Sequence, residues 1–82
     1  MSADVEALIA EAVADFRRAL PSRVARIAAL VSDPVGLRAE AHALAGAAGC
    51  YGFDAVSEAA RAVEDDGAVA LPSLIVVAEA CR

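Results

Sequence analysis

Apolar residues recur along most of the chain with the three- and four-residue spacing of amphipathic helices. Residues 4–20 carry the clearest stripe, made of Val5, Leu8, Ile9, Ala12, Val13, Phe16, Ala19 and Leu20. Pro21 interrupts the pattern, because proline lacks a backbone donor and crowds the preceding turn. Ser22 can cap a second helical segment that runs to about Val31. The pattern leaves open whether these segments are two helices or one long helix kinked at Pro21.

A third helical segment is predicted over residues 34–50. Asp33 followed by Pro34 is a capping residue before a proline at the first helical position, which is a strong start signal. The segment ends near Cys50, and Gly52 is suited to a left-handed conformation just beyond the helix end.

Two further helices are predicted after this segment. Residues 53–65 form an amphipathic helix that turns Glu58, Arg61, Glu64 and Asp65 toward water. Residues 71–81 have helical spacing, although the β-branched run at 75–77 also allows a short strand. We favour a helix, because a lone strand would have no partner. The sum is an all-α, antiparallel four-helix bundle whose N-terminal helix is kinked or broken around Pro21.

Composition narrows the function classes. The 82 residues form one small domain, residues 1–82, and the net charge of −5 argues against nucleic-acid binding. Cys50 and Cys81 form no C-x-x-C pair, which favours free thiols over a zinc site. The first residues lack the features of a signal peptide, and no apolar run is long enough to span a membrane. We therefore expect a cytoplasmic protein that is not bound to a membrane.

Residues 41–53, AHALAGAAGCYGF, contain the only histidine, His42, and three of the five glycines. Helical geometry places Arg38, His42, Ala45 with Gly46, and Gly49 on one face, opposite an apolar stripe of Leu37, Ala41, Leu44 and Ala48. We therefore expect His42 to point into solvent. A glycine within a helix costs about 1 kcal/mol relative to alanine, so these glycines need a reason. At Gly46 we favour clearance for a partner, whereas at Gly49 and Gly52 helix packing or chain termination is an equal alternative.

The order His42, Leu44, Gly46, Gly49, Gly52 resembles the signature of the histidine-containing phosphotransfer (HPt) domain family. That family usually reads H-x-L-K-G, followed by small residues and a further glycine. This chain departs from the pattern at Ala45, where the family commonly has lysine, and all seven of its basic residues are arginine. The resemblance implies a four-helix bundle of HPt type.

The resemblance also implies a function. His42 would be the phosphoacceptor, usually through Nε2, and would carry a phosphoryl group between aspartates of receiver domains. An exposed imidazole suits this role, because it is largely neutral and nucleophilic near neutral pH. The expected partners are response regulator receiver domains and a hybrid sensor histidine kinase. The receiver would supply Mg²⁺ and its own lysine, so the protein would be a monomeric carrier, not an enzyme, with no cofactor of its own.

The remaining face of this segment would dock the partner. We expect Arg38, Ala45, Gly46 and Gly49 to provide docking and clearance around His42. Arg38 either replaces the missing lysine as a cation near the phosphoryl group or is an ordinary solvated arginine that pairs with Glu40.

Three other functions stay open at this point. The bundle could be a binding module that docks on a receiver or kinase domain without phosphorylation. It could be a hydrolase with His42 as base, although no serine or cysteine has a recognisable nucleophile motif. It could also be the phosphorylation domain of a chemotaxis-type kinase. Those domains are usually joined to others, whereas this chain ends at Arg82, so we expect a freestanding relay protein.

Overall fold

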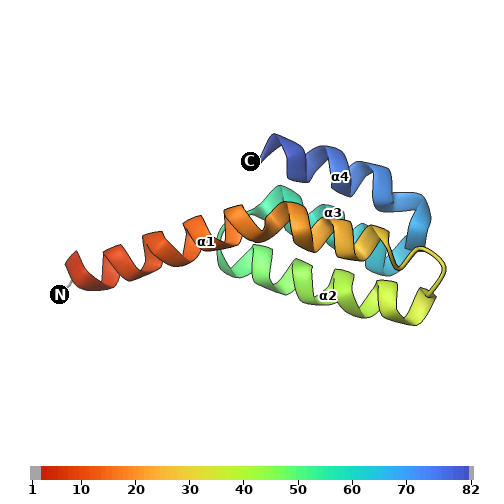
Figure 1. Ribbon diagram of the computed structural model, residues 1–82, viewed down its shortest axis with the longest axis horizontal. Helices are drawn as coiled ribbons and strands as arrows, with labels where there is room; N and C mark the ends of the chain where they lie inside the picture. The colour runs from red at the N-terminus through yellow and green to blue at the C-terminus, as the bar shows by residue number, and fades with distance from the viewer. Residues whose placement is uncertain (1–2, 82) are drawn as a thin grey trace.

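Helices account for nearly all of residues 3–81, the part of the chain that the computed structural model describes (Figure 1). In chain order they are α1 (Ala3–Ala28), α2 (Pro34–Cys50), α3 (Asp54–Asp66), the short 3₁₀ helix η1 (Gly67–Ala70) and α4 (Leu71–Ala80). No strand occurs in this part of the chain, so the all-α prediction is confirmed. The run at 75–77 is helical, as we favoured.

The N-terminal segments form one helix and are not broken at Pro21, which lies inside α1. Figure 1 shows the helix axis changing direction near its middle, which fits a proline that lacks the backbone donor of its turn. An interior proline costs about 3 kcal/mol, whereas each buried leucine, isoleucine or valine contributes about 1.5–3 kcal/mol. Leu20, Val24 and Ile27 are all buried around Pro21. Continuing the helix keeps these three side chains on one face, which outweighs the cost of the proline.

The core is formed by buried side chains from the second half of α1 and from the other three α-helices. Its largest fully buried side chains are Leu20, Ile27, Leu44, Leu74, Val56 and Val63. A short turn joins α2 to α3, so the two helices run antiparallel and side by side (Figure 1). Between them, the Ser57 hydroxyl donates to the carbonyl of Ala45 at 2.9 Å. This α2–α3 hairpin is the frame that carries the predicted site.

The ends of α2 follow the sequence signals closely. Asp33 caps the helix by accepting a hydrogen bond from the backbone N–H of Gly36 at 3.1 Å, and Pro34 is the first helical residue. The helix ends at Cys50, and Gly52 has a φ of +83°, the left-handed conformation that glycine adopts most readily. Both boundaries of the histidine-bearing helix were therefore predicted correctly.

The first half of α1 extends beyond the other helices (Figure 1). The molecule accordingly measures 46 × 20 × 17 Å along its principal axes. Val5, Leu8 and Ile9, which belong to the predicted apolar stripe of residues 4–20, are 52%, 65% and 58% exposed. They have nothing to pack against, because the turn between α2 and α3 lies beside Phe16, whose ring is 5.3 Å from that of Tyr51. The predicted antiparallel four-helix bundle is therefore confirmed only in part, because the first half of α1 lies outside the packed helices. Among residues 3–81, no helix is both long and apolar enough to cross a membrane.

Candidate functional site

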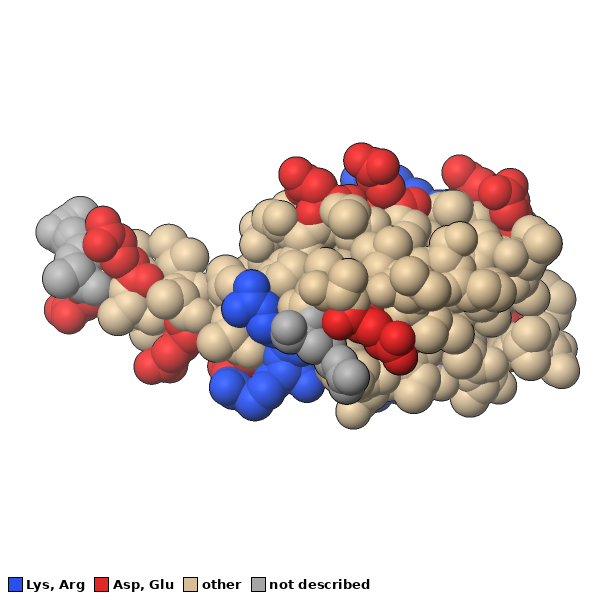
Figure 2. All heavy atoms as spheres, turned by 90° about the horizontal axis from the view of Figure 1, so that it is seen from above, with Lys and Arg blue, Asp and Glu red and all other residues tan. Residues whose placement is uncertain are grey.

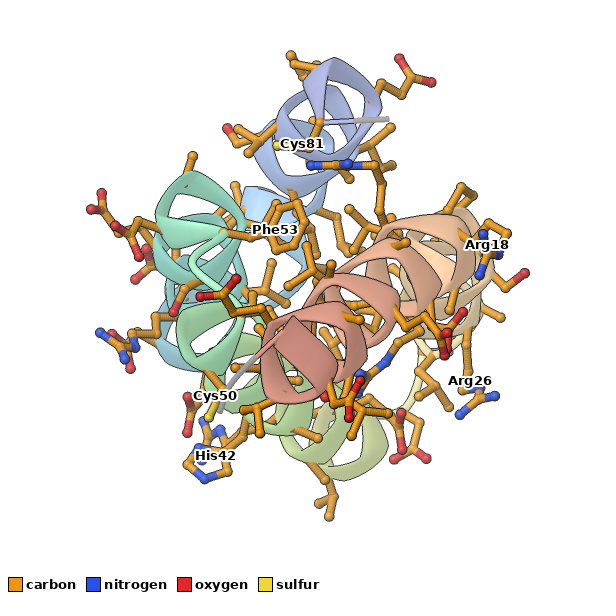
Figure 3. All side chains as sticks on the ribbon, turned by 90° about the vertical axis from the view of Figure 1, so that its left-hand side faces the viewer. Arg18, Arg26, His42, Cys50, Phe53 and Cys81 are labelled. Atoms are coloured by element: carbon orange, nitrogen blue, oxygen red, sulfur yellow. The ribbon has the colours of Figure 1, made fainter. Side chains whose placement is uncertain are left out.

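His42 lies near the middle of α2 and projects outward from the helix hairpin (Figure 3). Its side chain is 76% exposed, so the prediction that the imidazole faces solvent is confirmed. The helix presents it this way because the opposite stripe, Leu37, Ala41, Leu44 and Ala48, is buried. Burial of one face of α2 therefore determines where the histidine points.

The imidazole ring of His42 forms a hydrogen bond with one side chain of the neighbouring helix α3. Nδ1 of His42 donates to Oε2 of Glu64 on α3, with 2.8 Å between the two atoms. We had expected Glu64 to face water, and sequence reasoning missed this contact. A signal was present in the hairpin: His42 lies ten residues before Gly52, and Glu64 lies twelve residues after it. In an antiparallel pair of helices joined near Gly52, such residues stand at the same level.

The contact gives the two ring nitrogens different roles. An ionised carboxylate accepts hydrogen bonds and cannot donate them, so in the neutral ring this contact favours the tautomer that carries its proton on Nδ1 and keeps a lone pair on Nε2. Within residues 3–81, no side chain or backbone group hydrogen-bonds to Nε2. The arrangement thus presents Nε2 to solvent as a nucleophile or base. The carboxylate behind the ring would stabilise the positive charge that develops when Nε2 forms a bond.

Arg38 lies one turn before His42 and is exposed. Together with Val35, Ala39, His42 and Glu64 it lines one shallow depression. Arg38 is the only basic residue of α2. The structure therefore brings the guanidinium of Arg38, the imidazole of His42 and the carboxylate of Glu64 to the same surface depression. The sequence predicted this for Arg38 and His42, which share one face of the helix, but not for Glu64.

Ala45 does not belong to this surface. It is only 3% exposed, so placing it among the docking residues was wrong. At about 100° per residue, Ala45 lies about 60° from His42 on the side of Ala41 and Ala48, which is the buried side of the helix. Its methyl group packs in the core, and its carbonyl accepts the hydrogen bond from Ser57.

The two glycines after His42 differ in their surroundings. Gly46 lies on the exposed side of the helix, and a Cβ atom there would meet nothing within 4 Å. A Cβ atom at Gly49 would lie 3.5 Å from the hydroxyl oxygen of Ser57. Open space beside the imidazole therefore exists at Gly46, whereas Gly49 borders the contact between α2 and α3.

Other chemically active side chains do not join the site. Cys50 is exposed and Cys81 is half-buried, and both are free thiols. Within residues 3–81, no group of three or more histidine, cysteine, aspartate or glutamate side chains is placed to hold a metal ion.

The sequence matches the family model described as the Hpt domain over residues 11–80, which is most of the chain. Comparisons with curated proteins and with solved structures give no significant match. The matched segment contains all of α2 and α3, including His42 and Glu64. On this evidence, the chain belongs to the Hpt domain family.

Proposed function

We propose that this protein carries a phosphoryl group on Nε2 of His42 and exchanges it with aspartates of receiver domains in a phosphorelay. Hpt domains are phosphocarrier modules that interact with receiver domains and are not enzymes in themselves. The observation that carries the proposal for this chain is the exposed imidazole whose Nδ1 is held by Glu64. That geometry leaves Nε2 available to a partner.

The proposed transfer is a single displacement at phosphorus. The lone pair of Nε2 forms a bond to the phosphorus of an aspartyl phosphate, while the bond from phosphorus to the aspartate oxygen breaks and the carboxylate leaves. The proton on Nδ1 stays in place, and Glu64 offsets the positive charge of the ring. The reverse displacement passes the group to another receiver aspartate. Phosphoryl transfer depends mainly on in-line positioning and charge stabilisation, which the receiver would complete with its Mg²⁺ and lysine.

Arg38 is the residue that we propose to offset the charge of the phosphoryl group. Ala45 stands where the family commonly has lysine, and its methyl group is buried, so no cation comes from that position. Arg38 lines the same depression as His42 and is exposed. Its guanidinium can donate several hydrogen bonds to phosphoryl oxygens.

The partners, oligomeric state, cellular location and cofactor requirement of the protein are part of the same proposal. We propose that response regulator receiver domains and a hybrid sensor histidine kinase are the partners, and that the protein acts as a monomer in the cytoplasm. We also propose that it needs no cofactor of its own.

A transfer assay tests the proposal directly. The purified protein is incubated with receiver domains carrying a labelled aspartyl phosphate, and acid-labile, base-stable label is measured on the chain. We expect label on the wild type and none on His42→Gln. This variant should fold normally, because the side chain is exposed. Binding of the receiver without any label would instead support a docking module, and label on His42→Gln would assign the chemistry to another residue.

The same assay decides the role of Arg38. We expect Arg38→Ala to take up label more slowly and to lose it faster, because the phosphoryl charge is no longer offset. Arg61→Ala, which removes an exposed arginine of α3, is the matched control. Wild-type uptake and half-life in Arg38→Ala would show that Arg38 is only solvated.

A further inference from the structure

The part of α1 that projects from the molecule, residues 4–15, is here called the N-terminal arm (Figure 1). Its exposed apolar side chains Val5, Leu8 and Ile9 follow the i, i+3, i+4 spacing, so they form one stripe. Leucine and isoleucine side chains scattered over a surface need no explanation, but three that are contiguous on one face form a candidate interaction site.

The stripe leads directly into the aromatic end of the core. Phe16 follows the arm and is buried, and its ring centroid lies 5.3 Å from that of Tyr51 and 5.1 Å from that of Phe53. Tyr51 is itself partly exposed in the turn between α2 and α3. The arm and the turn therefore form a corner with apolar side chains on both walls.

All charged side chains of the N-terminal arm are acidic. The arm contains Asp4, Glu6, Glu11 and Asp15 and no arginine, and the first arginines of the chain follow at 17 and 18. Figure 2 shows acidic side chains along the arm and basic ones where it joins the body. Within the described residues, Asp15 pairs with Arg18, whereas Asp4, Glu6 and Glu11 form no ion pair. The apolar stripe is thus flanked by carboxylates available to a partner.

The negative charge of the N-terminal arm argues against two possible binding partners, a second copy of the chain and an anionic lipid surface. A second copy that paired its arm with this one, parallel or antiparallel, would bring carboxylates against carboxylates, because neither arm carries a basic residue. Like charges at such positions are destabilising and select against self-pairing. An anionic lipid surface would be repelled for the same reason, since helices that bind such surfaces carry lysine and arginine on the polar face.

We propose that the N-terminal arm is a docking site for a basic amphipathic helix of another protein, whose apolar face covers Leu8 and Ile9 and whose lysines or arginines pair with the flanking carboxylates. An arm of 12 residues is about 18 Å long, which matches three turns of a partner helix. The inference does not rest on phosphotransfer, since no residue of the arm lines the depression that contains His42.

The test uses two labelled helical peptides with the same leucine face, one with lysine and the other with glutamate at every flanking position. Fluorescence anisotropy of each peptide is measured during titration with the full chain. We expect the lysine peptide to bind at least tenfold more tightly than the glutamate peptide. Tyr51 is the only tyrosine and the chain has no tryptophan, so a tyrosine-free peptide seated in the corner should change the emission of Tyr51.

Matched variants locate the binding site. Leu8→Ser with Ile9→Ser should weaken binding of the lysine peptide at least tenfold, whereas Val69→Ser, which alters an exposed valine of η1, should not. Glu6→Gln with Glu11→Gln should weaken it several-fold more than Glu58→Gln with Glu79→Gln, although both pairs change the net charge equally. All four altered glutamates are exposed, and circular dichroism checks that each variant keeps its helices.

Three results would overturn the inference. Equal binding of both peptides would mean that charge does not select the partner. Equal effects of the two glutamine pairs would mean that the lysine peptide responds to net charge and not to the arm. Sedimentation of the wild type as a dimer that Leu8→Ser with Ile9→Ser converts to a monomer would show that a second copy covers the arm.

Discussion

The two nitrogens of the His42 ring have different surroundings, and this difference is what makes a plain surface histidine a candidate carrier. Nδ1 is bound to Glu64 at 2.8 Å, while the ring as a whole is largely in solvent. A carboxylate behind an imidazole orients the ring and fixes which nitrogen is protonated. Glu64 is therefore a positioning residue in the proposed transfer, since it acts on the reacting nitrogen through the other side of the ring.

At the residue scale we predict that Glu64→Ala slows uptake of the phosphoryl group from a receiver about fivefold. Contacts of this kind between side chains that are at least partly exposed contribute up to about 1 kcal/mol, which corresponds to that factor in rate. Glu64→Gln should lose less, because its side-chain carbonyl can still accept from Nδ1.

Nitrogen NMR of His42 gives the accompanying readout. We expect the fraction of neutral rings protonated at Nδ1 to fall in Glu64→Ala and to stay unchanged in Glu58→Ala, which alters an exposed glutamate elsewhere on α3. If Glu64→Ala keeps both the wild-type tautomer and the wild-type rate, Glu64 does not position the ring.

The N-terminal cap of α2 determines where the helix that carries the site residues begins. The Asp33 carboxylate accepts from the N–H of Gly36, and a Cβ atom at Gly36 would lie only 2.6 Å from the other oxygen of that carboxylate. Glycine therefore leaves the space that the capping side chain occupies. The cap therefore sets where α2 begins, whereas burial of its apolar face sets the direction in which Arg38 and His42 point.

At the element scale we predict that Asp33→Ala lowers the free energy of unfolding by about 1 kcal/mol, the usual value of a helix N-cap. Ser32→Ala, next to it and outside the helix, should change stability by no more than a few tenths of that amount. Urea denaturation followed by circular dichroism measures both. Equal midpoints for the two variants would show that the cap does not stabilise α2.

The whole molecule consists of a packed body and the N-terminal arm, joined by one continuous helix. The same stripe of α1 runs through both parts, but only its second half packs in the body, where α1 contacts α2 and α4. Leu20 is fully buried, whereas Leu8 is 65% exposed. The stability of the fold therefore rests on residues after about Phe16, and the arm contributes surface.

At this scale we predict that Leu20→Ala lowers the free energy of unfolding by about 2–5 kcal/mol, as expected for a leucine removed from a core. Leu8→Ala, the same substitution on the same helix, should cost less than about 0.5 kcal/mol. Urea denaturation at low protein concentration compares the two. Similar losses would mean that the arm is covered in solution, which would contradict the structure of the isolated chain.

Several features of the fold and the site could be predicted from the sequence alone. The helical segments, the cap at Asp33, the left-handed Gly52 and the solvent position of His42 all follow from spacing within one helix or from the chemistry of a single turn. Such features depend on residues three or four positions apart, and their pattern is visible in the sequence.

The tertiary structure decided what lies between helices. Glu64 reaches His42, and Val5 and Leu8 are left exposed, and neither outcome follows from the periodicity of a single segment. An apolar stripe specifies a face to be covered, but it does not specify where the covering helices end or which side chains meet at their edges. Those outcomes depend on the lengths, register and rotation of the packed helices, which are settled only when the helices come together.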